Sequence, residues 1–452
     1  MILDVTHHAD HDCRVTVLVV GAGPAGLATA RALQANGLDY VQVERHAGVG
    51  GLWDIDNPGS PMYESAHFIS SRTLSAFSGY PMPQDYPDYP SRRQVLGYLQ
   101  GFAEQYDLPG RIRFNTAVQA IQRQPDGTWS ASFTDGSQER FSAVACATGM
   151  LWEPLTPKYP GHFDGTIRHS VTYRNADDLR GKRVLVIGAG NSGCDIASDI
   201  GRIADQTYLS VRRGYWFIPK HVFGIPSDVF AESGPHLPIR LQQRLFGWLL
   251  RVINGDVTRL GLPRPDHRLF ETHPILNTEI LQRLQHGDVI AKPDVARLDG
   301  AQVQFTDGSS VPIDVIITAT GYRHTIPYAQ AYVGDEQFPD ALYLSTFSRQ
   351  FHNLFVMGFI ETNSAAFGLF DLSAQLVAGY LRAQQDDPKA AAAFDARIAS
   401  DQPDLSGGIR FVHSPRHTGY VDSTALKKAY LQALARTGWS LPDSSDQLVA
   451  VG

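Results

Sequence analysis

Two stretches of the chain share one pattern of apolar and polar positions. Residues 16–20 (TVLVV) and 183–187 (RVLVI) are short runs of mainly β-branched and aliphatic side chains, and a glycine-rich turn follows each run directly. Apolar runs of this length predict strands that are buried on both faces of a parallel sheet. Residues 27–36 and 194–202, which follow the turns, have the pattern of helices. The chain therefore predicts the same strand–turn–helix unit twice.

Both turns carry the glycine spacing G-x-G-x-x-G. The first turn is GAGPAG at residues 21–26, and the second is GAGNSG at residues 188–193. Such glycines permit a tight turn, let backbone N–H groups approach a pyrophosphate, and leave the anion at the positive end of the helix. One such motif is a weak signal, because glycine turns between a strand and a helix are common. Two copies in the same context predict two bound dinucleotides.

The residues that follow the second strand of each unit differ in charge. Residues 40–43 lead into Glu44, the carboxylate expected about 20 residues after the motif to hydrogen-bond an unphosphorylated ribose. Residues 207–211 lead instead into Arg212 and Arg213. A carboxylate repels a 2′-phosphate, whereas a guanidinium binds one through paired hydrogen bonds. We therefore predict FAD at the first site and NADP at the second, with an ordinary solvated pair as the alternative for the arginines.

Composition is consistent with a soluble enzyme of more than one domain. The chain has 452 residues, 43% of them hydrophobic and 19% charged, and a net charge of −7. The acidic balance argues against a nucleic-acid partner, which requires a basic face. The first ten residues lack the basic and apolar regions of a signal peptide, and no apolar run reaches membrane-spanning length. We therefore expect a cytoplasmic protein without a transmembrane segment.

Cysteine and histidine usage excludes two further classes of protein. Cys13, Cys146 and Cys194 include no pair at C-x-x-C spacing, so the dithiol of the disulfide reductases is absent. The sixteen histidines form no H-E-x-x-H motif and have no cysteine partners. No metal site is predicted.

Further motifs resemble those of the flavin-containing monooxygenases. Residues 50–53 (GGLW) match the G-G-x-W segment that this family has beside its flavin, and residues 163–173 (FDGTIRHSVTY) match its signature F-x-G-x-x-x-H-x-x-x-Y. Residues 314–322 (DVIITATGY) are similar to the A-T-G-Y segment of this family and of the related amine N-hydroxylases, and residues 147–149 have the same A-T-G form. The resemblance covers residues 15–385. By itself, the histidine of this signature, His169, is equally well interpreted as a linker residue bonded to the backbone.

The resemblance implies an α/β fold of two Rossmann-like dinucleotide-binding domains, with the NADP domain inserted into the FAD domain. Residues 1–165 and 322–452 would form the FAD domain and residues 166–321 the NADP domain, with a double hinge at the A-T-G segments. Residues 217–286 are richer in proline, histidine and aromatic residues than a nucleotide fold requires, so we expect a substrate-side excursion there. Within it, residues 239–253 predict an amphipathic helix that covers a substrate channel or a dimer seam, or lies on a membrane surface. The family also suggests a homodimer.

For the activity, the resemblance implies a monooxygenase that uses NADPH and dioxygen. In this family NADPH reduces FAD, dioxygen adds to give a flavin hydroperoxide, and one oxygen atom passes to a small organic substrate. Sulfide or amine oxygenation and Baeyer–Villiger oxidation of a ketone are both open. The alternatives are an NADPH-dependent flavoprotein reductase that passes electrons to a partner, and a nucleotide sensor without turnover.

One position departs from the family pattern. Members that oxidise nitrogen and sulfur carry an asparagine six residues after a tyrosine, and counting from Tyr63 that place is Ile69, which cannot hydrogen-bond oxygen. His67 lies two residues earlier, on the same side of an extended segment. We therefore predict that His67, with Ser70 or Ser71, replaces the asparagine and favours Baeyer–Villiger oxidation. The alternative is that His67 only packs and bonds the backbone.

The predicted cofactor-binding residues lie in the two glycine motifs, in the loops after the second strands, in the G-G-x-W segment, in the two A-T-G segments and at Val118. The full set is Gly21, Gly23, Pro24, Ala25, Gly26, Glu44, Arg45, Gly51, Leu52, Trp53, Val118, Thr148, Gly149, Gly188, Gly190, Asn191, Ser192, Gly193, Arg212, Arg213, Thr320 and Gly321.

Overall fold

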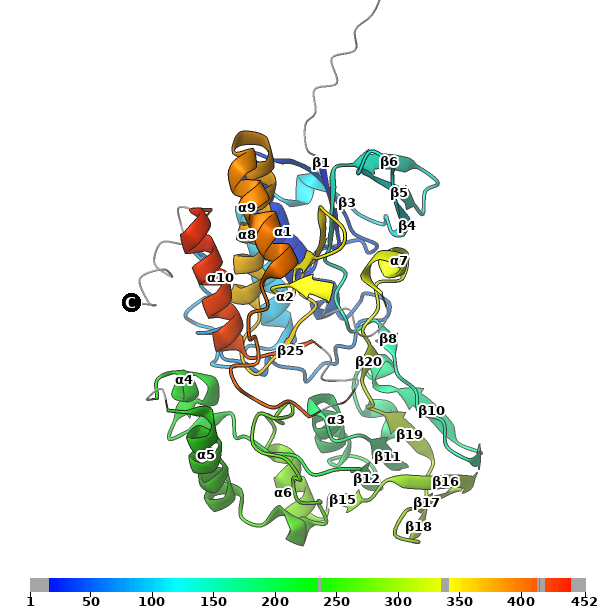
Figure 1. Ribbon diagram of the computed structural model, residues 1–452. Helices are drawn as coiled ribbons and strands as arrows, with labels where there is room; N and C mark the ends of the chain where they lie inside the picture. The colour runs from blue at the N-terminus through cyan, green and yellow to red at the C-terminus, as the bar shows by residue number, and fades with distance from the viewer. Residues whose placement is uncertain (1–15, 235–236, 335–340, 413, 415–418, 440–452) are drawn as a thin grey trace, which may run out of the picture.

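The computed structural model describes residues 16–234, 237–334, 341–412, 414 and 419–439. This part of the chain forms an upper and a lower half, each built on a mainly parallel sheet with helices against it (Figure 1). The strands of the upper sheet lie within residues 16–146 and 342–356, and those of the lower sheet within residues 166–318. The lower half is therefore inserted into the upper half.

The upper sheet has seven strands, of which five run parallel. In spatial order they are β21 (Leu342–Tyr343), β22 (Phe347–Ser348), β23 (Leu354–Val356), β7 (Ala143–Cys146), β1 (Thr16–Val20), β2 (Asp39–Val43) and β3 (Ile112–Arg113). β1 is buried on both faces because its alternate side chains enter two cores. Val17 and Val19 pack among helices, whereas Leu18 and Val20 pack against an antiparallel meander.

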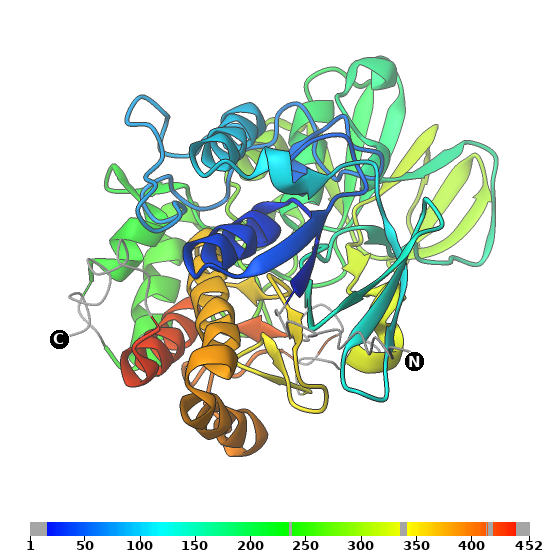
Figure 2. The ribbon, with the colours of Figure 1, turned by 90° about the horizontal axis from the view of Figure 1, so that it is seen from above.

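Helices cover one face of the upper sheet and the meander covers the other. The helices are α1 (Pro24–Ala35), α2 (Arg92–Gln105), α8 (Phe367–Asp386), α9 (Pro388–Ser400) and α10 (Ser423–Thr437), and the meander is β4 (Val118–Arg123), β5 (Trp129–Phe133) and β6 (Gln138–Phe141). Figure 2 shows α1 in blue beside α8 in orange, although they are far apart in sequence. A buried ion pair between Arg31 of α1 and Asp371 of α8 joins them.

The lower sheet repeats this plan with five parallel strands. Their order is β10 (Thr166–His169), β19 (Val315–Thr318), β11 (Arg183–Ile187), β12 (Gln206–Ser210) and β15 (Val289–Lys292). Val184 and Val186 face the core beside α3 (Asn191–Ile200) and α6 (Glu279–His286). Leu185 and Ile187 face a second small sheet, made of β18 (Ser310–Pro312), β17 (Gln302–Phe305), β16 (Val295–Gly300) and β9 (Gly161–Phe163).

These features confirm the predicted fold class of two Rossmann-like halves, one inserted into the other. Both predicted strands and both predicted helices are present, with α1 beginning at Pro24 and α3 at Asn191. The domain boundaries at residues 165 and 321 stay predictions. β9 (Gly161–Phe163) lies before the predicted boundary at residue 165, yet it pairs with β16 of the lower half.

The excursion at residues 217–286 contains mostly short elements. It holds the hairpin of β13 (His221–Val222) and β14 (Ile225–Pro226), then α4 (Ser227–Glu232), α5 (Ile239–Asn254), a 3-10 turn (Val257–Leu260) and α6. α5 is the predicted amphipathic helix, and its apolar side chains Leu241, Leu245, Trp248 and Val252 are 42–65% exposed. Within the described ranges, none of the helices has the length and apolarity that a membrane span requires.

Candidate active site between the two phosphate loops

The first phosphate loop, residues 21–26, leaves no room for side chains at two of its glycines. Gly21 has a φ of +111°, and a Cβ atom there would lie 2.6 Å from the carbonyl oxygen of Ala147. A Cβ atom on Gly26 would overlap the carbonyl oxygen of Gly21. Pro24 opens α1, where its missing N–H costs no helical hydrogen bond. The loop thus presents bare backbone at the positive end of α1, as a bound pyrophosphate requires.

The second phosphate loop, residues 188–193, has the same geometry. Gly188 has a φ of +105°, and its Cβ atom would lie 2.5 Å from the carbonyl oxygen of Ala319. A Cβ atom on Gly193 would overlap the carbonyl oxygen of Gly188. Ala147 and Ala319 open the two A-T-G segments. In each half, therefore, the A-T-G backbone packs against the first glycine of the phosphate loop, a contact that the sequence does not reveal.

The start of α3 has one residue turned toward the protein and one toward solvent. Gly190 precedes the helix in an extended conformation. Asn191 accepts a hydrogen bond at its Oδ1 from the Leu276 backbone N–H at 2.9 Å, so its amide anchors the segment after the excursion. Ser192 is exposed. Of the two polar residues predicted here, Ser192 is the exposed one, and its side chain also hydrogen-bonds Tyr63.

The G-G-x-W segment lies directly on the first phosphate loop. The Gly50 N–H donates to the Ala22 carbonyl oxygen at 3.0 Å. A Cβ atom on Gly51 would lie 2.9 Å from the Cα of Gly23, so glycine is required at this close approach. Leu52 and Trp53 continue a 3-10 turn (Gly51–Trp53). The segment predicted to contact the flavin therefore forms one wall of the first cradle.

The two ribose-binding positions differ in burial as well as in charge. Glu44 follows β2 and is 5% exposed; its carboxylate accepts from the backbone N–H groups of Ala22 at 2.7 Å and His46 at 2.9 Å. Burial raises the pKa of Glu44.

At the second site, Arg212 lies just after β12, is exposed, and has no ion-pair partner among the described residues. Arg213 instead stacks on Tyr215, with its guanidinium 5.5 Å from the ring centroid. Arg212 is therefore the freer of the two guanidinium groups.

A tryptophan joins the Glu44 loop to the first A-T-G segment. The Arg45 guanidinium lies 4.0 Å from the ring centroid of Trp152, whose Nε1 donates to the Thr148 carbonyl oxygen at 2.5 Å. Gly149 has a φ of +73°, and a Cβ atom there would approach the same ring. Val118 opens β4 and is half-buried. The structure thus brings Arg45, Thr148 and Gly149 together around Trp152.

The two chain crossings between the halves are bonded to each other. β8 (Glu153–Pro154) and β20 (Tyr322–Arg323) pair in antiparallel fashion. The Leu155 N–H donates to the Gly321 carbonyl oxygen at 2.9 Å, and the Thr320 hydroxyl donates to the Leu155 carbonyl oxygen at 2.5 Å. The second A-T-G segment, where one half of the double hinge is predicted, is therefore joined through Thr320 and Gly321 to residues 153–155, and these parts form one hydrogen-bonded unit.

The signature histidine, His169, fixes this unit. Its Nδ1 accepts from the Val171 N–H at 3.1 Å, which leaves Nε2 to donate to the Gly321 carbonyl oxygen at 3.1 Å. Burial lowers the pKa of His169, which favours the neutral ring that this pattern requires. Both ring nitrogens bond the backbone, so the linker interpretation of this histidine is confirmed.

A short segment of the upper half, residues 62–65, is held by carboxylates of the lower half. The Tyr63 hydroxyl donates to Asp195 of α3 at 2.6 Å, and Asn277 donates to the same carboxylate at 2.5 Å. The Ser65 hydroxyl donates to Asp199, one turn further along α3. Burial raises the pKa of Asp195. Neither carboxylate is among the residues predicted from the sequence; their i, i+4 spacing beside buried helix positions is the signal that could have marked them.

The predicted catalytic segment continues directly from there and alternates in burial. His67 is exposed and Ile69 half-buried, whereas Phe68 is buried and packs edge-on against Trp53 with ring centroids 4.7 Å apart. His67 and Ile69 therefore share a side, as the extended conformation predicts. The His67 Nδ1 lies 2.7 Å from the Ser65 carbonyl oxygen.

The two serines do not converge with His67. Ser70 is buried, and its hydroxyl bonds that of Ser75 at 2.7 Å. The Ser71 N–H donates to Asp228 of α4 at 2.6 Å, and its buried hydroxyl has no hydrogen-bond partner within the described residues. Of the three predicted catalytic residues, only His67 offers an exposed side chain.

Thiol and metal chemistry find no support in the described residues. Cys146 and Cys194 are free and buried, and burial raises the pKa of Cys146 to about 12 and that of Cys194 well above its usual value. Cys13 lies outside the described residues. No group of three or more histidine, cysteine, aspartate or glutamate side chains that could hold a metal ion occurs in the part of the chain described.

Comparison with known proteins places this architecture in a family. Residues 14–407 match the family model described as flavin-binding monooxygenase-like. Human flavin-containing monooxygenase 5 is 32% identical over 434 residues, which span 90% of this chain and 81% of that protein. The open crystal structure of cyclohexanone monooxygenase superposes with a TM-score of 0.69 at 17% identity, covering 95% of this chain and 99% of that one. The structure of S-allyl-L-cysteine S-oxygenase from Allium sativum superposes with a TM-score of 0.64 at 20% identity, covering 95% and 89%.

The chain therefore belongs to the flavin-binding monooxygenase family, whose members are oxidoreductases. FAD and NADPH are the cofactors of this family, and the two loops fit them: each is a cradle that a single Cβ atom would fill. The predicted family, enzyme class and cofactors are confirmed.

Proposed function

We propose that this protein is an NADPH-dependent monooxygenase that inserts one oxygen atom of dioxygen into a small organic substrate. The observation that carries the proposal is the pair of matching phosphate loops with opposite ribose-binding charges, Glu44 in one half and Arg212 in the other. Family membership supports it further. On the sequence grounds given above, we place the activity in the cytoplasm.

The upper loop would hold FAD and the lower loop NADPH. Residues 21–26 would bind the FAD pyrophosphate, and Glu44 would accept hydrogen bonds from the ribose hydroxyls. The G-G-x-W segment would line the site beside the flavin. Residues 188–193 would cradle the NADPH pyrophosphate, and Arg212 would bind its 2′-phosphate. The two cofactors supply hydride transfer and activation of dioxygen; the protein's part is to position them and exclude water.

We infer that the substrate meets the flavin near residues 67–69. His67 is the exposed hydrogen-bonding side chain of that segment, while Phe68 anchors the segment on Trp53. Because Nδ1 donates to the Ser65 carbonyl oxygen, Nε2 can donate only from the protonated ring. That imidazolium would stabilise developing negative charge on oxygen, and negatively charged oxygen adds to the carbonyl carbon of a ketone. His67 therefore favours Baeyer–Villiger oxidation over sulfide or amine oxygenation.

Isotopic labelling tests the proposal. The FAD-loaded protein is supplied with NADPH and ¹⁸O-labelled dioxygen, together with a cyclic ketone in one reaction and a dialkyl sulfide in another. We expect one labelled oxygen atom per molecule of ester or sulfoxide, with faster turnover of the ketone. NADPH oxidation that yields only hydrogen peroxide with both substrates, together with fast reduction of artificial electron acceptors, would instead favour the reductase alternative.

A further inference from the structure

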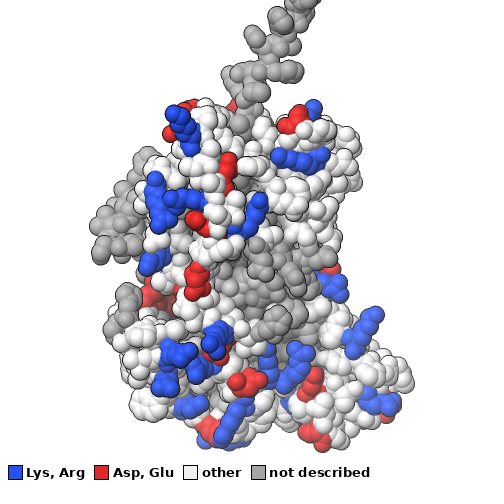
Figure 3. Space-filling view, viewed as in Figure 1, with Lys and Arg blue, Asp and Glu red and all other residues white. Residues whose placement is uncertain are grey.

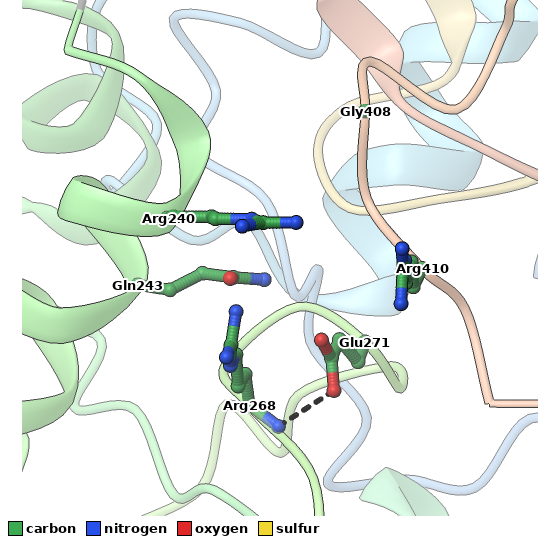
Figure 4. Close-up of a pocket in the computed structure, with 6 residues that line it drawn as sticks. All are labelled: Arg240, Gln243, Arg268, Glu271, Gly408 and Arg410. Carbon is green, nitrogen blue, oxygen red and sulfur yellow. Dashed lines mark hydrogen bonds between the residues drawn. The ribbon is translucent and has the colours of Figure 1, made fainter.

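A cavity of about 280 Å³ lies at the seam between the excursion and the C-terminal part of the chain. It is lined by Arg240, Gln243, Arg268, Glu271, Gly408 and Arg410. Figure 4 shows the arginine side chains pointing toward one another from three separate segments: the first turn of α5, the loop before Glu271, and the segment after Gly408. Residues that are far apart in sequence thus present the same cationic group to one space.

These three arginines have no anionic partner among the described residues. Several arginines elsewhere in the described part of the chain are paired, as Arg31 is with Asp371 and Arg202 with Glu279, whereas Arg212 is not. Glu271 forms no ion pair with the three arginines; its Oε2 accepts from the Arg268 backbone N–H at 2.8 Å. The lining therefore carries three positive charges and one negative charge, a net charge of +2. Figure 3 shows basic side chains gathered over this end of α5.

Like charges around one concavity raise the local positive potential and attract an anion. Guanidinium groups bind carboxylate and phosphate oxygens through paired hydrogen bonds, which makes three of them a recognition element for a multiply charged ligand. The cavity lies at the lower end of the roughly 300–1,000 Å³ of typical ligand pockets, which suits a small ligand. Gln243 is 6% exposed, and its amide is held by a hydrogen bond to the Leu269 carbonyl oxygen at 3.0 Å, so this wall is rigid.

We propose that this cavity is a binding site for a small dianion that carries phosphate or carboxylate groups, separate from both dinucleotide sites. The ligand neutralises the net charge of the lining and joins Arg240 and Arg268 of the excursion to Arg410 of the C-terminal segment. These parts already touch, because the Val412 N–H donates to the Glu271 carbonyl oxygen at 2.8 Å. Binding therefore stabilises an existing seam and does not depend on the proposed reaction.

The seam also continues toward the lower phosphate loop. A few residues beyond Glu271, the Leu276 N–H bonds Asn191, which opens α3. An anion that fixes Arg268, whose backbone N–H bonds Glu271, thereby supports the position of Asn191 without contacting NADPH. We expect phosphate and NADPH to bind together, with neither displacing the other.

Thermal unfolding and calorimetry of the full-length, FAD-loaded protein test this site. Inorganic phosphate is titrated against sodium chloride at matched ionic strength, and succinate serves as a dicarboxylate probe. We expect a saturable rise in Tm with phosphate, succinate or both, and none with chloride. Arg240→Gln and Arg410→Gln should weaken binding about 10-fold or more, since each removes a charge-assisted hydrogen bond. Arg244→Gln, on α5 but outside the lining, is the matched control and should bind normally.

Three results would overturn the site: an equal rise in Tm with chloride, equal anion affinity in Arg240→Gln and Arg410→Gln, or displacement of phosphate by saturating NADPH. Arg268→Lys adds a check at a third position of the lining. It keeps the charge but loses the planar fork, so we expect a smaller loss of affinity than in Arg268→Gln, at unchanged FAD content. Identical affinities in these two variants would contradict guanidinium recognition.

Discussion

The hydroxyl of Tyr63, in the upper half of the molecule, donates a 2.6 Å hydrogen bond to Asp195, which lies on the helix that begins at the lower phosphate loop. Both groups are buried, and burial raises the pKa of each. Tyr63 is also four residues before His67. Together with the Ser65–Asp199 hydrogen bond, this contact connects the helix at the NADP-side loop to the segment proposed to face the substrate.

Tyr63→Phe should destabilise the protein. The substitution keeps the ring but leaves the buried Asp195 carboxylate with Asn277 as its remaining side-chain donor, at a cost of about 1–3 kcal/mol. Urea unfolding of the FAD-loaded protein measures this cost. Tyr173→Phe is the control, because its hydroxyl lies 3.4 Å from Asp199 and contributes a weaker bond. Equal stability of Tyr63→Phe and wild type would show that the contact does not hold the two halves.

Alanine at the first glycine of each loop should remove one cofactor and spare the other. Gly21→Ala drives a Cβ atom into the Ala147 carbonyl oxygen, and Gly188→Ala drives one into that of Ala319. We expect Gly21→Ala to purify without flavin, and Gly188→Ala to keep flavin but lose NADPH binding. Flavin absorbance and NADPH titration distinguish these outcomes.

Gly136→Ala is the matched control for backbone strain in these two variants. Gly136 also has a positive φ, +85°, but has no atom within 4 Å of its Cβ position. It should retain both cofactors. Loss of both cofactors in either loop variant, with normal behaviour of Gly136→Ala, would mean that the two loops are not independent sites.

Arg212→Ala should weaken NADPH selectively. Removal of a charge-assisted bond worth about 1.5–3 kcal/mol lowers affinity roughly 10- to 150-fold. NADH lacks the 2′-phosphate, so its affinity should not change. Arg213→Ala is the control, because that guanidinium stacks on Tyr215. A loss that is the same for NADPH and NADH would remove Arg212 from the phosphate site.

His67→Ala should reduce ketone oxidation more than sulfide oxidation. One donor to a developing oxyanion is typically worth about 10²–10³ in rate. The protonated ring of His67, whose Nδ1 bonds the Ser65 carbonyl oxygen and whose Nε2 then also carries a proton, is the exposed donor on this segment. Product yields per NADPH oxidised give the measurement, with the exposed His162 of β9 replaced by alanine as a control. Unchanged yields with both substrates in His67→Ala would leave His67 as a packing residue.

Much of the fold follows from local patterns in the sequence. The runs at residues 16–20 and 183–187 are buried on both faces, so their composition alone indicates parallel strands, and the glycines that follow require conformations and close approaches that few other residues tolerate. The Glu44 and Arg212 positions follow from a fixed distance along such a unit. These features were predictable because each depends on residues close together in sequence.

The contacts between the halves were not predictable in the same way. Asp195 and Tyr63 are hydrogen-bonded although they are 132 positions apart in sequence. The three arginines of the anion cavity come from segments at residues 240, 268 and 410. No periodicity links such residues, because tertiary packing alone brings them together. The serines show the same limit: extended spacing placed His67 correctly relative to Ile69, but could not show that Ser70 bonds Ser75 in the interior.

The most direct test of the central claim, that two dinucleotide sites cooperate to activate dioxygen, is a rapid-mixing experiment. FAD-loaded protein is reduced with NADPH without air and mixed with oxygenated buffer, while the near-ultraviolet and visible absorbance of the flavin is followed. We expect a lasting absorbance distinct from those of oxidised and reduced flavin, which decays faster when a substrate is present. Immediate return to oxidised flavin, with or without ketone or sulfide, would contradict it.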